Sequence, residues 1–259
     1  MQIHDGIGQR FDYPHKADRI VSVVPSQTEL LAYLGLNQEV IGITKFCVHP
    51  QAWHSTKHRV GGTKKLHLEK ILELNPDIVF ANKEENERTD IEWLKERVPV
   101  YVSDIITIDD ALRMIGDVGL LCGKSTIADQ LIKDIQHERD VFKVPSGIYG
   151  TALYLIWQDP FMTISSDTFI HHMLEAAGFE SALEGFFEGR YPTLELADII
   201  ALQPKFVFLS SEPYPFGEKE LHQLKMALPD SKIMLVDGEM FSWYGPRMKE
   251  AFSYLSTLG

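Results

Sequence analysis

Short apolar runs alternate along the chain with longer segments whose apolar residues recur every three or four positions. The short runs are typical of buried strands in a parallel sheet, and the longer segments are typical of amphipathic helices. The pattern predicts strands at 19–24, 40–44, 78–81, 98–102, 152–156, 207–209 and 233–236. It predicts helices at 30–34, 67–74, 90–97, 168–177, 199–202, 221–228 and 246–258. Alternating strands and helices indicate an α/β fold with mainly parallel sheets.

A capping signal follows the first predicted strand. Ser26 and Glu29 have the spacing of a capping box, in which two side chains bond to free backbone N–H groups at a helix start. We therefore expect Pro25 to end the strand and the helix to begin after Ser26. Gly35 is expected to stop that helix, because glycine readily adopts the left-handed conformation at helix ends.

The chain contains an internal repeat of a helix followed by a strand. Residues 68–82 and 196–210 share their pattern at an offset of 128 residues (203 − 75), with the steps Asn75-Pro76 and Gln203-Pro204 at the same place. Proline disfavours helical geometry at the preceding residue, so each step is expected to end its helix. A second pair of segments aligns Gly35 with Gly178. Two copies predict two lobes with a ligand-binding cleft between them.

A long helical pattern lies between the two repeats, from Thr107 to Val141. One interpretation is a stiff helical spine of about 30 residues, well above the average helix length. The other is two ordinary helices broken at Gly123. With the first interpretation, the chain divides into an N-terminal lobe (1–105), a connecting helical spine (106–144) and a C-terminal lobe (145–259).

Length and charge narrow the classes of function. The 259 residues suit two lobes of about 100–130 residues each. A net charge of −12 disfavours general affinity for nucleic acid or anionic lipid. No apolar run approaches the ~20 residues of a membrane span, and residues 1–18 carry no apolar signal segment. We expect no membrane insertion; the sequence as written is that of a cytoplasmic protein, and a leader outside it would make the protein periplasmic or cell-surface.

Polar and aromatic side chains gather just after the predicted strands. In open parallel sheets, ligands bind beyond the carboxyl ends of the strands. Aromatic rings beside carboxylates suit a flat or bulky ligand, because rings offer a large contact area at low entropic cost. The candidate ligand-binding residues from this placement are Ser26, Glu84, Trp157, Glu212, Tyr214, Glu239 and Trp243.

Cys47 and His49 suggest an alternative, a directly bound metal ion. They lie two residues apart on a loop and could ligate a soft or borderline metal, although two ligands are too few for a site. Carboxylates across the predicted cleft could complete a Zn or Mn site: Glu84, Glu212, Asp237 or Glu239.

An enzyme is the less favoured alternative. The chain has no nucleophile elbow, no zinc-protease helix, no phosphate loop and no dinucleotide glycine fingerprint. Carboxylates near Asp159, Glu212 and Glu239 could perform acid–base chemistry, which keeps a small-molecule hydrolase open.

Several sequence motifs, taken together, are specific for one class of proteins. Residues 19–29 (Arg-Ile-Val-Ser-Val-Val-Pro-Ser-Gln-Thr-Glu), 40–44, 60–63, 68–71 and 75–79 resemble the substrate-binding proteins of ABC importers for cobalamin, haem and iron-siderophores. This is the helical-backbone metal receptor class of periplasmic binding proteins (class III). The likeness extends over essentially the whole chain, to Pro246-Arg247, which adds Arg247 to the candidate ligand-binding residues. It implies two Rossmann-like lobes joined by one long helix, with ligand in a shallow cleft.

The resemblance also assigns positions to the ligand site. By comparison with the cobalamin-binding members, Phe46 stands where an aromatic residue lines the cleft, and Tyr191 matches an aromatic residue of the second lobe. Thr63 stands where a tryptophan is expected. Glu239 and Trp243 fall where an acidic residue and an arginine are expected. These departures argue against cobalamin itself and leave a bulky metal chelate as the ligand.

The same family uses one surface glutamate per lobe to dock on arginines of the membrane permease. Glu69 retains the first, whereas Ala197 occupies the second position with Glu195 and Asp198 close by. We therefore predict a monomeric solute-binding protein, not an enzyme and without a cofactor of its own. It captures cobalamin, haem or a ferric siderophore, for uptake by an ABC permease.

Overall fold

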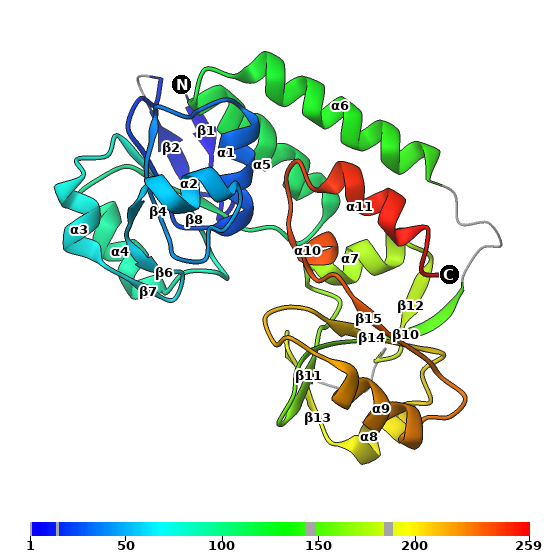
Figure 1. The fold of residues 1–259 in the computed structure, drawn as a ribbon. Helices are drawn as coiled ribbons and strands as arrows, with labels where there is room; N and C mark the ends of the chain where they lie inside the picture. Colours follow the sequence, from blue (N-terminus) through cyan, green and yellow to red (C-terminus); the bar gives the residue numbers. More distant parts are fainter. Residues whose placement is uncertain (1, 14–15, 143–148, 184–188) are drawn as a thin grey trace. The chain divides into compact units, whose positions relative to one another are not determined.

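The computed structural model describes residues 2–13, 16–142, 149–183 and 189–259, and its chain forms two compact units (Figure 1). The first lobe comprises Met1–Ile105, Asp109–His137 and Tyr244–Pro246. The second lobe comprises Ile106–Ile108, Glu138–Trp243 and Arg247–Gly259. Each lobe has its own sheet, as the internal repeat predicted.

The first lobe is built on a five-stranded parallel sheet with the strand order β5-β4-β3-β8-β9. Its strands are β3 (Ile20–Ser22), β4 (Val40–Ile43), β5 (His58–Arg59), β8 (Ile78–Asn82) and β9 (Val100–Ser103). All five residues of β8 are buried, which is typical of a parallel strand with both faces covered. The core on these strands includes Val21, Val79, Ala81 and Val102, packed against helix residues such as Ile71 and Leu94.

Helices and two hairpins surround this sheet. The helices are α1 (Pro25–Tyr33), α2 (Gln51–Thr56), α3 (Leu68–Glu73), α4 (Arg88–Lys95), α5 (Ile108–Leu121) and most of α6 (Ser125–Val141). The hairpins are β1-β2 (Gln2–His4 and Arg10–Asp12) and β6-β7 (Gly61–Gly62 and Lys65–Leu66). The β1-β2 hairpin is tied to the sheet edge, because the N–H of Gly6 donates to the carbonyl of Val102 at 2.7 Å.

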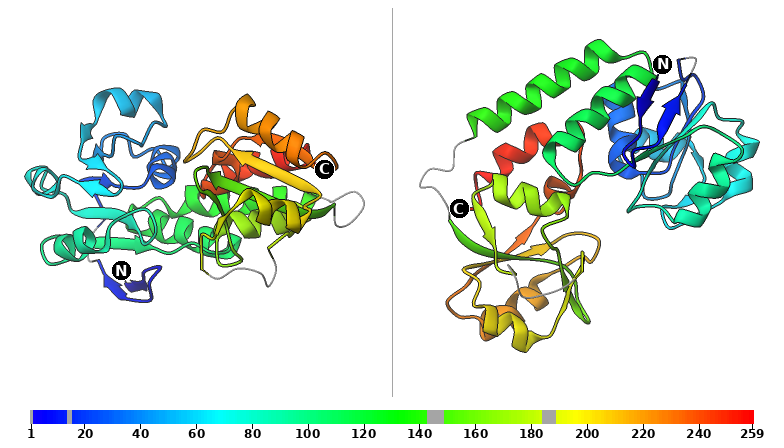
Figure 2. Two further views of the ribbon diagram at one scale, coloured as in Figure 1. Left: turned by 90° about the horizontal axis from the view of Figure 1, so that it is seen from below. Right: turned by 180° about the vertical axis from the view of Figure 1, so that it is seen from behind.

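The segment that follows β9 matches the second of the two interpretations: α5 and α6 are separate helices, broken at Gly123 with φ +64°. Helix α6 has 17 residues and α5 has 14. The two helices lie side by side (Figures 1 and 2). Gly119 makes this possible, because a Cβ there would lie 2.3 Å from the Cβ of Ala128.

The second lobe has a six-stranded mixed sheet. Its strands are β10 (Gly150–Trp157), β11 (Phe161–Thr163), β12 (Phe179–Ser181), β13 (Thr193–Leu194), β14 (Phe206–Ser210) and β15 (Lys232–Val236). Strand β10 pairs in parallel with β12 and β14, and β14 with β15, whereas β11 pairs antiparallel with β10 and β13. The helices are α7 (Phe169–Ala176), α8 (Leu196–Leu202), α9 (Glu218–Ala227), α10 (Glu239–Ser242) and α11 (Met248–Leu255).

The backbone confirms both repeated segments. Helix α3 and strand β8 correspond to helix α8 and strand β14, and all five residues of β14 are buried like those of β8. The residues before the two prolines, Asn75 and Gln203, have nearly equal positive φ angles of 47° and 45°. Gly35 and Gly178 are likewise both left-handed after α1 and α7, with φ of +75° and +84°.

One predicted helix start is wrong. Helix α1 begins at Pro25, not after Ser26, and no side chain caps it. Proline is suited to the first helical turn, because its missing N–H would have no intrahelical acceptor there. Ser26 therefore lies within the helix, where it is 5% exposed. Within the described ranges, no helix has the length and apolar character that a membrane crossing requires.

Candidate functional site

The carboxyl ends of β8 and β9 in the first lobe carry a buried polar network. The side-chain amide of Asn82 donates to the hydroxyl of Ser103 at 3.0 Å and to its carbonyl at 3.2 Å. The amide of Gln27, on α1, donates to the same hydroxyl at 2.6 Å. All three residues are at most 2% exposed. Strand pairing sets the network, since Asn82 and Ser103 are direct partners in the β8–β9 ladder.

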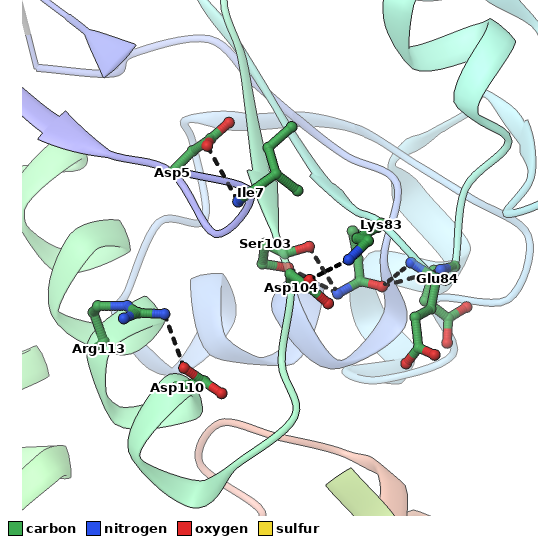
Figure 3. A network of polar contacts seen from close by, with 10 residues as sticks. Asp5, Ile7, Lys83, Glu84, Ser103, Asp104, Asp110 and Arg113 are labelled. Atoms are coloured by element: carbon green, nitrogen blue, oxygen red, sulfur yellow. Dashed lines mark hydrogen bonds and ion pairs between the residues drawn. The ribbon is translucent and has the colours of Figure 1, made fainter. Parts of the chain in front are cut away.

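The same network shapes the loop that follows β8. The side-chain oxygen of Asn82 accepts from the backbone N–H groups of Glu84 and Glu85 at 2.8 and 3.0 Å. Asn86 closes the loop, because its side-chain oxygen accepts from the N–H of Asn82 and its amide donates to the carbonyl of Thr63. Figure 3 shows Glu84 and Ser103 in this network. The first lobe thus satisfies most of its strand-end polar groups internally, and Glu84 is half-buried.

Phe46 presents an exposed ring in the first lobe. The residue is 51% exposed, and a Cβ on Gly62 would lie 3.2 Å from the ring. The ammonium group of Lys45 lies 4.8 Å from the ring centroid. Thr63, predicted at a ligand-contact position, is only 9% exposed. Phe46 is therefore the predicted residue of this lobe whose side chain is most available to a ligand.

In the second lobe, aromatic side chains collect at the ends of β10 and β14. Trp157, the last residue of β10, is 42% exposed, and its ring packs edge-on against Tyr214 with centroids 5.6 Å apart. The Tyr214 ring in turn packs against the buried Phe216 ring, with centroids 4.8 Å apart. The N–H of Tyr214 donates to the carbonyl of Ile156, which anchors the loop after β14 to β10. Elsewhere in this lobe, Tyr191, which shortly precedes β13, is 40% exposed.

Glu212 is the central polar residue of this second-lobe end. Its Oε1 atom accepts from the hydroxyl of Ser242 at 2.6 Å and from the indole N–H of Trp243 at 2.9 Å. Burial raises the pKa of the Glu212 carboxyl, and the nearby charges of Glu239 and Asp237 raise it further, while the two hydrogen bonds lower it. The net direction is upward, so this carboxyl binds a proton more readily than an ordinary glutamate.

Glu239 and Trp243 share a cationic partner. The guanidinium of Arg247 pairs with Glu239 at 2.9 Å and lies 5.0 Å from the centroid of the Trp243 ring. The arginine expected at residue 243 is therefore replaced by a tryptophan that itself holds an arginine over its ring. A cavity of about 490 Å³ lies beside Glu212 and Glu239, within the size range of small-molecule sites. It is lined by Ser211, Glu212, Leu235, Val236, Asp237 and Glu239.

Gly238 allows the loops after β14 and β15 to approach closely. A Cβ at this position would lie 2.4 Å from the hydroxyl oxygen of Ser210 and 2.7 Å from the Cγ of Glu212. The N–H of Gly238 donates to the hydroxyl of Ser211 at 2.9 Å. A side chain at residue 238 would push Glu212 away from Ser242 and Trp243.

Within the described residues, the predicted metal ligands Cys47 and His49 have no further metal-ligating side chains grouped with them. The thiol of Cys47 is fully buried and lies 3.1 Å from the hydroxyl of Thr28 and 3.2 Å from that of Thr44. Burial raises the pKa of this thiol, which disfavours the thiolate that a metal requires. No group of three or more potential ligands exists among the residues that the structure describes, His49 included.

The two glutamates predicted to dock on a permease occupy similar places in the two lobes. Glu69 lies in the first turn of α3, and Glu195 immediately precedes α8; both are exposed. The carboxylate of Asp198 accepts from the N–H of Glu195 at 2.8 Å, so Asp198 is engaged in capping the start of α8. Glu195 is the N-cap residue of the same capping box and is the more exposed of the two residues.

The structure thus groups the predicted ligand residues by lobe. Ser26, Phe46, Thr63 and Glu84 belong to the first lobe, and Trp157, Tyr191, Glu212, Tyr214, Glu239, Trp243 and Arg247 belong to the second. Sequence reasoning missed Ser103 and Ser242, which organise the two ends. The sequence signal for the first network is the spacing of Asn82 and Asn86, two amide side chains four positions apart after a strand.

Comparison with known proteins decides the family. The model of the family described as "Periplasmic binding protein" matches residues 20–226. The chain belongs to this family. It is 23% identical over 199 residues to a vitamin B12-binding protein of Vibrio parahaemolyticus, covering 74% of this chain and 70% of that protein. The class of protein that the sequence motifs indicated is confirmed.

Solved structures show the same fold. The periplasmic vitamin B12-binding protein BtuF of Vibrio cholerae matches with a TM-score of 0.80 at 19% identity, over 94% of this chain and 97% of that chain. The periplasmic haem-binding protein RhuT of Roseiflexus sp. RS-1 matches with a TM-score of 0.78 at 22% identity, over 93% and 97%. The predicted periplasmic-binding-protein fold of class III is therefore confirmed.

Proposed function

We propose that this protein captures a metal chelate, with cobalamin, haem or a ferric siderophore as the candidate ligands. The observation that carries the proposal is the exposure of aromatic rings at predicted ligand positions. Phe46 and Tyr191, which the family resemblance assigns, and Trp157, at the end of a strand, are 40–51% exposed. Aromatic rings that stay partly exposed beside one another are typical of a binding surface, and the rings of Trp157 and Tyr214 lie with their centroids 5.6 Å apart. They suit a flat macrocycle or a bulky chelate.

The polar groups of the second lobe support the same ligand class. Glu212, Glu239 and Arg247 place acceptors and a cation at the strand ends of the lobe that exposes Trp157. Tetrapyrroles and siderophores both carry amide, carboxylate or hydroxyl groups around an apolar or metal-bearing centre. Thr63 in place of a tryptophan removes one wall that cobalamin would meet, which favours haem or a ferric siderophore over cobalamin.

We further propose a partner for the protein, an ABC permease that binds the exposed carboxylates of Glu69 and Glu195. Charge reversal at both positions (Glu69→Arg with Glu195→Arg) should abolish stimulation of the permease ATPase while leaving chelate affinity unchanged. Reversal at Asp198 should instead destabilise α8, because Asp198 bonds to the backbone. Unchanged ATPase stimulation by the double variant would exclude this docking mode.

The decisive experiment is a titration of the protein with cobalamin, haem, a ferric hydroxamate, Zn²⁺ and Mn²⁺, followed by tryptophan fluorescence and thermal unfolding. A chelate that binds the folded state should quench fluorescence and raise Tm by mass action. Trp157→Phe should lose most of the quenching. Trp93→Phe is the matched control, because Trp93 lies on α4 with the guanidinium of Arg97 over its ring and is not a predicted ligand residue.

Each other result has a distinct meaning. A response to Zn²⁺ or Mn²⁺ alone would support the direct metal receptor in place of the chelate binder. Recovery of a chemically altered chelate would contradict the proposal that the protein binds without catalysis. The absence of any response to all five compounds would remove the binding function proposed here.

A further inference from the structure

Trp243 contacts two residues of the second-lobe cavity without lining the cavity itself. Among the described residues, Glu212 and Glu239 belong to the lining and Trp243 does not. Trp243 is only 8% exposed, so little of its ring is available to a ligand. A buried ring that contacts two lining residues is placed to hold them, which differs from the direct ligand contact predicted from the sequence.

The first contact is with the carboxyl of Glu212. The indole N–H of Trp243 donates to Oε1 of Glu212 at 2.9 Å, and the hydroxyl of Ser242 donates to the same oxygen at 2.6 Å. No described residue donates to Oε2 of Glu212. Two donors from different directions fix the carboxyl through one oxygen and leave the other oxygen available to the cavity.

The second contact is with Glu239, and it has two parts. The backbone N–H of Trp243 donates to the carbonyl of Glu239 at 3.1 Å, which closes the single turn of α10. The guanidinium of Arg247 lies 5.0 Å from the centroid of the Trp243 ring and pairs with the Glu239 carboxylate at 2.9 Å. The electron-rich face of an indole attracts a cation, most strongly where water is largely excluded. The ring therefore restrains Arg247 and, through it, the carboxylate of Glu239.

Strand pairing explains how one side chain can hold both residues. Glu212 follows β14 and Glu239 follows β15, and these two strands pair in parallel. Their carboxyl ends therefore lie at the same edge of the sheet, where the N–H of Gly238 donates to the hydroxyl of Ser211 at 2.9 Å. The indole of Trp243 bridges the two loops that begin at this edge.

We propose that Trp243 is a positioning residue of the ligand site. Its indole N–H orients the carboxyl of Glu212, and its ring orients Arg247 and thereby the carboxylate of Glu239, so that the two carboxylates line the cavity in a fixed relation. This role rests on the proposed function, because the cavity lies in the lobe whose exposed rings are proposed to contact a chelate.

Three variants separate the contacts of Trp243. Trp243→Phe removes the N–H donor but keeps a ring face for Arg247. Trp243→Leu removes both the donor and the ring. Ser242→Ala removes the second donor to Glu212 and leaves Trp243 in place.

Trp53→Phe is the matched control. Trp53 is 4% exposed and belongs to the first lobe. Its indole N–H donates to the side-chain oxygen of Asn37 at 3.0 Å, and the ammonium group of Lys57 lies 5.2 Å from its ring centroid. It therefore has the same two kinds of contact as Trp243, but with residues that do not line the second-lobe cavity.

The first measurement needs no ligand. A ¹³C NMR titration of the glutamate carboxyls gives the midpoint of Glu212, whose resonance is assigned by its absence in Glu212→Gln. The two hydrogen bonds lower the pKa of Glu212, so Trp243→Phe and Ser242→Ala should each move this midpoint upward. Trp53→Phe should leave it unchanged. A general loss of stability would not move the midpoint, which distinguishes positioning from a merely structural role.

The second measurement is the affinity for two probes, haem and ferrioxamine B. For each probe that the unmodified protein binds, Trp243→Phe should raise the Kd by about threefold and Trp243→Leu by about tenfold, because the second variant also releases Arg247. In an Arg247→Gln background, the Phe and Leu variants should bind equally, since the ring then has no guanidinium to hold. Trp53→Phe should bind like the unmodified protein.

Two results would overturn the positioning role. One is a Glu212 midpoint that does not move in Trp243→Phe, or that moves as far in Trp53→Phe. The other is a Kd for a bound probe that is the same in Trp243→Phe, Trp243→Leu and the unmodified protein. Binding of neither probe to the unmodified protein would count against the proposed function, whereas the Glu212 midpoint would still support or overturn the role of Trp243.

Discussion

The two lobes share a helix–strand repeat but finish it with different chemistry. At the end of β8, Asn82 satisfies four neighbouring groups and closes its own loop. At the equivalent end of β14, Ser210 is a smaller hub that bonds to Tyr154 and to the backbone of Glu212. Next to it, a carboxyl with a raised pKa is held by Ser242 and Trp243.

This contrast separates what carries the fold from what is available for binding. The repeated parts are the buried strand, the proline step and the left-handed residue before it, which determine the direction of the chain. The loops that follow the two strands differ because they are not needed to pack the core. In the first lobe the loop after β8 bonds mostly to itself, and the exposed ring of Phe46 follows a different strand. In the second lobe the loop after β14 packs Tyr214 against the exposed ring of Trp157.

The largest expected effect is at Asn82. Asn82→Ala leaves the groups around Ser103 and the N–H groups of Glu84 and Glu85 without their partner, and should lower the free energy of unfolding by about 3 kcal/mol. Ser210→Ala at the equivalent position should cost about half as much. Urea unfolding monitored by circular dichroism measures both, and an equal cost would show that the two hubs do not differ.

Glu212 and Glu84 are the next equivalent pair. Glu212→Ala removes the acceptor of Ser242 and of the Trp243 indole, so we expect a loss of about 1.5 kcal/mol. Glu84→Ala should cost clearly less, because the loop is held through the backbone N–H of Glu84 rather than its carboxylate. The same unfolding assay applies, with a shift of the Trp243 fluorescence as an independent readout for the first variant.

Replacing Glu212 with glutamine tests the cause of its raised pKa. The folded-state pKa lies above the unfolded value, so the carboxyl contributes stability fully below its ordinary pKa and loses it as the pH rises through the folded value. The glutamine side chain in Glu212→Gln does not titrate but still offers an oxygen to Ser242 and Trp243. The stability of Glu212→Gln relative to the unmodified protein should therefore increase as the pH rises, which urea unfolding at a series of pH values measures.

Glu239→Gln is the control for this pH series, because it removes a neighbouring charge and leaves Glu212 in place. Glu212 should then titrate at a lower pKa than in the unmodified protein. If the relative stability of Glu212→Gln did not change with pH, burial would not be what controls this carboxyl.

The smallest effect concerns the left-handed residues. Gln203→Gly should stabilise the second lobe by about 0.5 kcal/mol, because glycine has no Cβ penalty at φ 45°. Asn75→Gly should have almost no effect or a slightly negative one, since asparagine tolerates this conformation and glycine costs more chain entropy. Thermal unfolding of the two variants side by side distinguishes them; a larger gain at residue 75 would contradict this account.

Sequence reasoning predicted the longer buried strands better than the short strands and hairpins around them. The predicted strands at 78–81 and 207–209 correspond to β8 (Ile78–Asn82) and β14 (Phe206–Ser210), because continuous apolar runs have few other places in a folded chain. The hairpin β1-β2 and the strands β11 to β13 were missed. Each of these strands has only two or three residues, too few for a period to be visible. The choice between one long helix and two helices was decided at Gly123, whose positive φ lies just after the end of α5.

For the candidate site, too, some features could be predicted from the sequence and others appear only in the structure. Sequence alone determined the family, the duplicated frame and the types of side chain that follow each strand, because these depend on local pattern and chain order. Tertiary structure alone decided which of those side chains remain available. It buried Cys47 and Thr63, exposed Phe46 and Trp157, and brought Ser242 to Glu212 across 30 residues of chain. Burial and hydrogen bonding depend on neighbours that are distant in sequence, and no local pattern encodes them.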